Sequence, residues 1–386
     1  MPKTIVFCAD GTWNSPGNDQ DSDELPDPTN VYKLFLALTG ELDGESLRNA
    51  DEQEKSHAVG GELRQVAKYI HGVGDSRNPI IKLMGGTFGA GVVSRIVRGY
   101  TFISRNYEPG DDIVITGFSR GAYTARALGG MIASQGLLDH AITDDKELAY
   151  RRGAEAWGRY RKASLSGKRG ALSALREVVS DLPGFLSQKN LRDEDLHPVE
   201  RIAAVAVWDT VGAMGLPQYA ADGERIDAYQ FADLELSTKV GVGLHAVALD
   251  EQRGDFTPTL WEPAAHVTQM LFPGAHCDVG GGYPTRDNQS GLADGALKWM
   301  ADQLAGVGVK FSAAGLRTLA PSAHGVAHQP WTHGPWKLMK PRSRRFDAEM
   351  ALAEHRSIVD RCAAPHVVHE PGEAPARYAP ANRPGA

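Results

Sequence analysis

The sequence predicts an α/β fold in which a mostly parallel sheet carries helices on both faces and one helical insertion. The runs 3–9 and 202–208 are almost continuously apolar, and 112–116 is β-branched over most of its length. Apolar runs of this length are typical of strands that are covered on both faces, as in parallel sheets. Segments with helical spacing separate these runs, and the alternation favours the α/β class.

The N-terminal part alternates predicted elements with polar loops. The strand at 3–9 leads into a turn at 10–14 and then into a loop at 15–28 that is rich in Pro, Gly, Asn and Asp. Thr29 or Asn30 can cap a helix that runs through Leu38. Residues 40–61 are polar, charged and punctuated by glycine, so we expect an exposed excursion there.

The middle of the chain predicts two more strands, each followed by a helix. A strand at 66–72 precedes a glycine-rich loop at 85–91 and a helix at 92–106, and the strand at 112–116 precedes a helix over 120–134. The glycine-rich loop matches neither the Gly-x-x-x-x-Gly-Lys pattern nor a Gly-x-Gly-x-x-Gly directly after a strand. We therefore interpret it as tight backbone packing rather than as a nucleotide site.

The rest of the chain begins with a block of different character. Residues 140–200 are rich in charge and carry apolar residues at helical spacing, which predicts an inserted pair of helices, either a cap over a site or a peripheral pair. Strands at 202–208 and 267–272 and a helix at 291–305 follow. We expect helices within residues 225–255, where the stretch 245–250 gives a mixed signal.

Length and charge limit the domain organisation and the partners. The 386 residues suit one large α/β domain or two smaller ones. We expect one domain over 1–320 and a C-terminal tail over 321–386 that wraps the surface or is partly disordered, because the tail has few periodic apolar residues. The net charge of −7 argues against a nucleic-acid partner, and three cysteines are too few for a disulfide framework.

The sequence indicates no membrane-spanning segment. The first apolar run ends at Asp10 and is too short for a signal-peptide core with a cleavage site. No apolar stretch approaches the ~20 residues that a membrane helix needs. We therefore expect a protein that is cytoplasmic as synthesised, while export by a signal-independent secretion system stays open.

The segment Gly117–Gly121 has the spacing Gly-x-Ser-x-Gly between a predicted strand and a predicted helix. This is the layout of a nucleophile elbow, in which Ser119 sits on a strained strand-to-helix turn. Gly117 and Gly121 have no Cβ, so strand and helix can approach closely enough to close the turn. A chance match is the alternative, and the flanking elements favour a nucleophile.

A serine nucleophile needs a base and a third group that orients the base. Asp209 directly follows the strand at 202–208, and His276 follows the strand at 267–272 between flanking glycines. Ser119, Asp209 and His276 thus occur in the order of α/β hydrolases, at strand ends that meet at one edge of a parallel sheet. The alternatives are Asp233, Asp250 and Asp255 for the acid, and His245 and His266 for the base.

A tetrahedral intermediate also needs backbone donors for its oxyanion. The amide of Arg120, directly after the serine, is the expected first donor. The second is expected from the turn after the first strand, where Gly11 and Thr12 can approach a ligand and Asp10 can orient the loop by accepting its N–H bonds. A plain turn is the alternative.

Asp278 and the glycines after it suggest a cation site, but the sequence does not supply the six or more oxygen ligands of a hard cation. No Cys/His pairing has the spacing of a zinc site. We therefore expect no metal and no other cofactor, and we treat Asp278 as a residue that supports the site.

Four motifs together resemble a known family. They are Phe7–Asn14 (FCADGTWN), Gly117–Arg126 (GFSRGAYTAR), Trp208–Gly212 (WDTVG) and Phe272–Tyr283 (FPGAHCDVGGGY). They resemble the α/β-hydrolase-like domain family that includes the first class of type VI secretion lipase effectors, as does Leu249–Phe256 (LDEQRGDF). The resemblance covers about residues 3–300 and implies that Ser119, Asp209 and His276 correspond to the family's catalytic triad.

The resemblance implies ester hydrolysis, because the characterised effectors are phospholipases. We therefore expect a serine hydrolase, an esterase or lipase that works through an acyl-enzyme, with lipid or phospholipid as the leading substrate. A membrane surface and a secretion or immunity protein are expected partners. The chain lacks the effectors' long membrane-docking region and an obvious adaptor segment, so a soluble esterase on a non-lipid or polymeric ester and a non-catalytic binding protein stay as alternatives.

Overall fold

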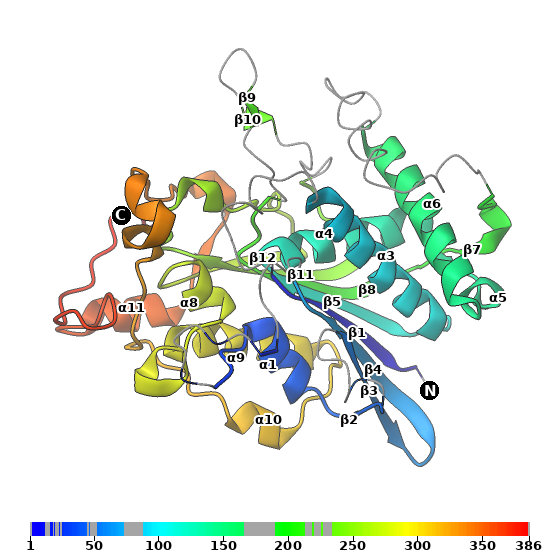
Figure 1. Cartoon of the computed structure of the whole chain (residues 1–386), viewed down its shortest axis with the longest axis horizontal. Coiled ribbons are helices and arrows are strands. Elements are labelled where there is room, and N and C mark those ends of the chain that lie inside the picture. Colours follow the sequence, from blue (N-terminus) through cyan, green and yellow to red (C-terminus); the bar gives the residue numbers. More distant parts are fainter. Residues whose placement is uncertain are drawn as a thin grey trace.

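A nine-stranded sheet forms the centre of the molecule (Figure 1). The computed structural model describes residues 2–11, 16–17, 19, 23, 25–44, 46, 52–72, 88–165, 190–212, 218–219, 225–226 and 234–384. The strands of the sheet are β1 (Thr4–Ala9), β2 (Glu41–Leu42), β3 (Glu52–Val59), β4 (Glu62–Ile70), β5 (Asp112–Phe118), β8 (Ile202–Trp208), β11 (Val240–Ala248), β12 (Val267–Phe272) and β13 (Ala353–Glu354).

The strand order is β13-β12-β11-β8-β5-β1-β4-β3-β2. Every neighbouring pair from β13 to β4 is parallel, and only β4–β3 and β3–β2 are antiparallel. Two short antiparallel ladders stand apart from the sheet, β6 (Leu137–Leu138) with β7 (Leu196–His197), and β9 (Gln218–Tyr219) with β10 (Arg225–Ile226). The predicted α/β class with a mostly parallel sheet is confirmed.

Helices cover both faces of the sheet (Figure 1). They are α1 (Asn30–Ala37), α3 (Phe88–Asn106), α4 (Arg120–Gln135), α5 (His140–Thr143), α6 (Lys146–Leu165), α8 (His276–Gly280), α9 (Gly291–Gly306), α10 (Ala313–Arg317) and α11 (Arg356–Ala363). Helices α3, α4 and α6 lie on one face, and α1, α9 and α10 lie on the other.

Alternate side chains of β1 enter the two halves of the core. Ile5 and Phe7 belong to the apolar cluster that includes residues of α3 and α4, whereas Val6 and Cys8 belong to the cluster that includes residues of α1 and α9. This is the period-two alternation of a strand, with both faces buried. The burial of both faces explains why the strand reads as a continuous apolar run.

Several predicted elements match the structure closely. Strands β8 and β12 have the predicted bounds. Helix α1 begins after Thr29, whose side chain accepts a hydrogen bond from the backbone N–H of Tyr32. A capping side chain at this position satisfies one of the four N–H groups that a helix start leaves without a partner in the helix.

The prediction of an exposed excursion at 40–61 was wrong over 41–42 and 52–57, while residues 45 and 47–51 lie outside the described part of the chain. Strands β2 and β3 extend the sheet from β4 instead. The inward positions of β3 include Gln53 and Lys55, which are buried. Lys55 Nζ donates to the carbonyls of Phe35, Leu36 and Leu38 at the end of α1. The last carbonyls of a helix lack the usual partners within it, so the hydrogen bonds from Lys55 hold the polar strand β3 against α1.

The expected helices at 225–255 were also wrong over 240–248, where β11 lies between β8 and β12. Gly243 weakens the strand signal of the sequence because it contributes no apolar side chain. The surroundings of this position are also crowded. A Cβ there would lie 2.3 Å from Leu236 Cδ2. Residues 227–233 lie outside the described residues.

The segment after residue 320 takes part in the sheet. Strand β13 pairs in parallel with β12, and Ile358 of α11 packs in a buried cluster with Leu271 of β12. The division into a domain over 1–320 and a tail over 321–386 stays a prediction. None of the described helices is both long enough and apolar enough to span a bilayer.

Substitution of Ile358 tests whether this segment is part of the cooperative fold. Ile358 is fully buried, so Ile358→Ala should lower the free energy of unfolding by about 2–4 kcal/mol through lost burial and a residual cavity. Urea denaturation measures the change. The matched control is Val359→Ala on the same helix, where the side chain is 53% exposed and the expected change is within about 0.5 kcal/mol. Equal midpoints for wild type and Ile358→Ala would show that the segment does not contribute to the transition.

Candidate active site

Ser119 occupies a strained turn between β5 and α4. Its backbone has φ 57° and ψ −121°, which a residue with a side chain rarely adopts. Gly117 and Gly121 allow the turn to close. A Cβ on Gly117 would lie 2.2 Å from the Gly121 carbonyl oxygen, and a Cβ on Gly121 would lie 2.2 Å from the Ala9 carbonyl oxygen. The sequence pattern therefore has a steric cause in this fold.

Asp209 and His276 are in direct contact. His276 Nδ1 donates to Asp209 Oδ2 at 2.6 Å, and both side chains are buried. Asp209 Oδ1 accepts the backbone N–H of Ala248 at 2.9 Å. With the proton on Nδ1, the Nε2 atom of His276 carries the lone pair, which is the tautomer that a general base requires.

The protonation states of this pair follow from burial and charge. Burial raises the pKa of Asp209, but the charge of Arg344 and the hydrogen bond from His276 outweigh it and hold that pKa well below its ordinary value. Burial lowers the pKa of His276, and the bond and charge of Asp209 offset only part of the effect. At neutral pH the pair is therefore a carboxylate and a neutral imidazole.

Ser119 lies beside this pair. Strands β5 and β8 are neighbours, with Phe118 opposite Trp208, so Ser119 and Asp209 follow adjacent strand ends. The ring of Phe118 lies 4.5 Å from the His276 ring. Among the described residues no hydrogen bond joins the Ser119 hydroxyl to His276, and such bonds often tighten only when substrate is bound.

The alternative acids and bases have other partners. Asp250 accepts hydrogen bonds from the Gly274 N–H and the Tyr378 hydroxyl, and Asp255 lies in the short 3₁₀ helix Gly254–Phe256. His245 Nε2 accepts the Thr210 N–H at 3.1 Å, and burial lowers its pKa to about 3. His266 Nε2 donates to the Leu236 carbonyl, and Asp233 lies outside the described residues.

Two of the expected oxyanion groups can be located. Arg120 is the first residue of α4, where backbone N–H groups point away from the helix and have no acceptor within it. The Gly11 N–H donates to Asp10 Oδ1 at 2.7 Å in this conformation. Thr12 lies outside the described residues, so its role and that of Gly11 stay predictions.

Asp10 is buried at the end of β1 and collects hydrogen bonds. Its carboxylate accepts from the hydroxyls of Thr29 and Tyr69 and from the Gly11 N–H. Burial raises its pKa to about 6, although these bonds act in the opposite direction. Asp10 thereby ties the loop after β1 to α1 and β4 beside the elbow.

Asp278 supports the loop that carries His276. Its Oδ2 accepts the N–H groups of Ala275 and His328, at 2.8 and 3.0 Å, and its Oδ1 accepts His328 Nδ1 at 2.7 Å. No cluster of three potential metal ligands occurs among the described residues. The carboxylate therefore links α8 to the C-terminal segment.

Sequence reasoning missed three residues that contact the site. Glu251 is buried and accepts the His276 N–H at 3.2 Å. His328 binds Asp278, and Arg344 binds Asp209 through both of its terminal nitrogens. His328 and Arg344 lie in a segment without periodicity, so no local signal marks them. Glu251 lies within the motif Leu249–Phe256, but the sequence pattern assigns no function to this residue.

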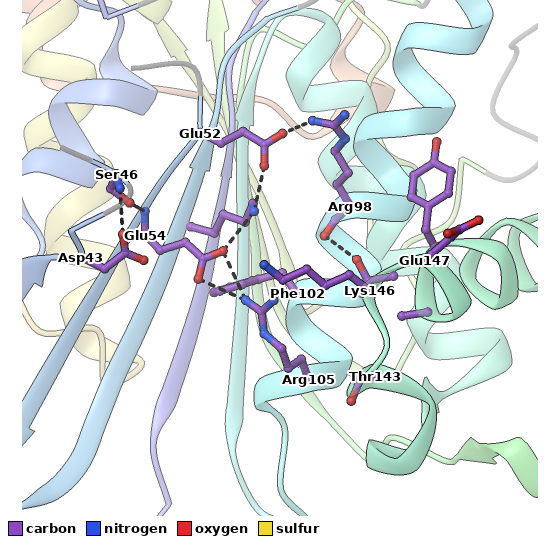
Figure 2. Close-up of a pocket in the computed structure, with 14 residues that line it drawn as sticks. Asp43, Ser46, Glu52, Glu54, Arg98, Phe102, Arg105, Thr143, Lys146 and Glu147 are labelled. Atoms are coloured by element: carbon purple, nitrogen blue, oxygen red, sulfur yellow. Dashed lines mark hydrogen bonds and ion pairs between the residues drawn. The ribbon is translucent and has the colours of Figure 1, made fainter. Parts of the chain in front are cut away.

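A separate charged cavity of about 540 Å³ lies between the β3–β4 pair and helices α3 and α6. Figure 2 shows Glu52 facing Arg98 and Glu54 facing Arg105 across it. Lys68 bridges both glutamates. The acidic and basic side chains that line this cavity compensate one another in charge. Ser119, Asp209 and His276 do not line it.

Comparisons with known proteins give a family and distant relatives. Residues 3–303 match the family model described as "T6SS, Phospholipase effector Tle1-like, catalytic domain". The uncharacterized protein YEL023C of Saccharomyces cerevisiae is 26% identical over 290 residues, which cover 72% of this chain and 35% of that protein. The chain thus spans about a third of the length of this relative.

Two solved structures match the chain at low sequence identity. An uncharacterized protein from Pseudomonas aeruginosa has a TM-score of 0.47 at 18% identity, over 84% of this chain and 49% of that chain. The Tle1 effector, in a structure bound to the VgrG spike of the type 6 secretion system, has a TM-score of 0.38 at 18% identity, over 76% of this chain and 53% of that chain.

The buried carboxyl of Asp10 should give a measurable pH dependence of stability. Its pKa is about 6 in the folded protein against an ordinary value of 3.8, so between these values the folded state holds a proton that the unfolded state has lost. The contribution of Asp10 to the free energy of unfolding should therefore fall by about 3 kcal/mol as the pH rises through this window. Asp10→Asn removes this dependence, although it also lowers stability overall because an acceptor oxygen is lost.

Urea unfolding from pH 4 to pH 7 measures the two profiles. The expected result is a flatter profile for Asp10→Asn than for wild type. The control is Asp302→Asn on α9, whose side chain is 54% exposed, and it should keep the wild-type profile. A profile of Asp10→Asn that runs parallel to wild type would contradict the assignment.

Proposed function

The chain belongs to the family of Tle1-like phospholipase effector catalytic domains, and we propose that it hydrolyses carboxylic esters of lipids by a serine mechanism. The nucleophile is Ser119, the base is His276 and the orienting acid is Asp209. The observation that supports this most directly is the 2.6 Å bond between His276 Nδ1 and Asp209 Oδ2 beside the strained Ser119 turn. Lipid is the substrate class because the family is one of phospholipase effectors.

Acylation begins when Ser119 Oγ attacks the ester carbonyl carbon. Its proton passes to His276 Nε2, and Asp209 stabilises the imidazolium that forms. The N–H of Arg120 donates to the oxyanion, with a second donor from the loop after β1. When the intermediate collapses, the imidazolium gives its proton to the leaving alcohol. An acyl-enzyme remains on Ser119.

Deacylation repeats these steps with water. His276 takes a proton from a water molecule, the resulting hydroxide attacks the acyl carbon, and the imidazolium returns the proton to Ser119 Oγ. The neutral state of His276 in the resting protein supports this role, because a base must begin without its proton. No step requires a cofactor.

The proposal extends to organisation and delivery. The catalytic domain is proposed over 1–320 with the segment 321–386 attached. Membership of a type VI secretion effector family supports export by that system, with a membrane surface as the site of action and a secretion or immunity protein as partner.

Ser119→Ala tests the nucleophile. Turnover should fall by at least about 10⁴-fold, because the acyl-enzyme cannot form, while the melting temperature stays close to wild type. Fatty-acid release from phospholipid vesicles and hydrolysis of nitrophenyl esters of increasing acyl length measure turnover, and a fluorophosphonate probe measures the reactive serine. Rates should rise with acyl length if lipid is the substrate.

The matched control is Ser134→Ala, an exposed serine on α4, the helix that follows Ser119, and this variant should keep activity and labelling. Turnover near wild type in Ser119→Ala would reject this nucleophile. A folded wild-type protein that neither labels nor hydrolyses any ester would instead favour a binding protein.

Asp209→Asn tests the acid. The amide cannot hold the imidazole in the required tautomer, so kcat should fall by about 10⁴-fold with little change in KM. Asp250→Asn is the comparison, since Asp250 is the alternative acid and binds Gly274 and Tyr378 instead. If Asp250→Asn is the variant that loses activity and Asp209→Asn is not, the acid is Asp250.

A further inference from the structure

Arg344 reaches the Asp209 carboxylate from outside the family match, which ends at residue 303. Its Nη1 donates to Asp209 Oδ1 at 2.7 Å, and its Nη2 donates to Asp209 Oδ2 at 2.9 Å. The same two nitrogens donate to the carbonyls of Ala248 and Phe256. The guanidinium thus forms a two-pronged pair with one carboxylate and is held in place by two further acceptors.

The pair is almost fully buried. Asp209 is 0% exposed and Arg344 is 7% exposed. A buried carboxylate is costly unless a charge and hydrogen bonds compensate it. His276 is neutral in the resting state and supplies a hydrogen bond without a charge, so the guanidinium is the group that neutralises Asp209.

We propose that Arg344 is a positioning residue for ester hydrolysis, which keeps Asp209 ionised and aimed at His276 Nδ1 while the imidazole is neutral. The catalytic role in this inference rests on the proposed function. Oδ2 accepts from both His276 and Arg344, so the guanidinium fixes the rotation of the carboxylate that orients the base. A lysine at 344 would keep the charge and lose the planar fork.

A purely structural anchor is the competing explanation. Arg344 also holds the Phe256 carbonyl, and the Phe256 ring lies 4.9 Å from the His276 ring. Loss of Arg344 could therefore loosen the wall of the site without any effect on protonation. The two explanations differ in whether the proton affinity of the Asp209–His276 pair changes.

The direction of that change follows from the surrounding charges. Other charged or titratable groups come from each element around the pair, namely Glu251 and Arg253 after β11, His245 of β11, Arg126 of α4, and Cys277 and Asp278 of α8. Arg253 is already bound to Glu251 through two nitrogens. Among the described residues Arg344 is the cation that touches Asp209, so its removal should raise the proton affinity of the pair.

The test uses the full chain with Arg344→Met and Arg344→Lys. In Arg344→Met, protonation of His276 should move to higher pH by about one unit or more, and kcat should fall by about tenfold or more. The acid limb of kcat/KM should move by the same amount. In Arg344→Lys the acid limb should stay within about 0.3 units of wild type while kcat falls, because the charge remains and the fork is lost.

Two readouts separate the explanations. NMR titration of ¹⁵N-histidine-labelled protein follows His276 directly, with the signal assigned from a His276→Gln sample. The pH profile of ester hydrolysis follows the same protonation through turnover. Arg345→Met is the control, because Arg345 is the exposed neighbour of Arg344 and should change neither readout.

Each outcome decides the proposal. A lower kcat in Arg344→Met with an unmoved His276 titration would overturn it in favour of the structural anchor. If Arg344→Met does not fold, Arg344→Lys decides, and an acid limb moved by a full unit there would overturn the proposal because the charge is still present. If wild type hydrolyses no ester, the proposed function fails, and the NMR titration still reports whether Arg344 sets the protonation of the pair.

Discussion

The structure around the candidate site depends on one buried carboxylate. Asp209 lies at the end of β8, in the middle of the sheet, where its side chain has no exposure to bulk solvent. It is satisfied by a neutral imidazole, a guanidinium and a backbone N–H, which come from α8, the C-terminal segment and β11. Each of these elements must be in place before the carboxylate is stable, so the site and the fold around it share the same interactions.

The elbow imposes the second constraint, because it brings backbones unusually close. Gly121 lies against the carbonyl of Ala9, and Gly280 lies against the ring of Phe118, where a Cβ would come within 1.9 Å of a ring carbon. The first contact joins the elbow to β1 and the second joins it to α8. Strain at Ser119 is thus maintained by packing on two sides, and α8 brings His276 with it. Gly121 and Gly280 therefore allow the turn to close and also allow the side chains of the site to be placed close together.

Sequence patterns predicted the parts of the site that depend on local structure. β8 is a continuous apolar strand and β12 ends in the apolar run 270–272, and the order of Ser119, Asp209 and His276 along strand ends was visible for that reason. The patterns failed where a polar side chain is buried through distant partners. Lys55 looks like a surface residue but satisfies the end of α1, and Arg344 lies in a stretch with no periodicity although it reaches the centre of the site. These pairings span 17 residues for Lys55 with Leu38 and 135 residues for Arg344 with Asp209, and neither leaves a trace in local spacing.

The composition of the C-terminal segment, residues 321–386, therefore gives no indication that it contacts the site. Its buried apolar side chains include Trp331, Phe346, Ile358 and Val367, and polar contacts attach it as well. Two of these attachments end on acids of the site, Arg344 on Asp209 and His328 on Asp278. Binding of the segment and ionisation of the site are consequently linked, since a group that binds only the ionised carboxylate favours that form by its own binding free energy. Arg344 supplies the compensating charge on Asp209, so the ionised carboxylate of the site depends on a side chain from beyond the family match.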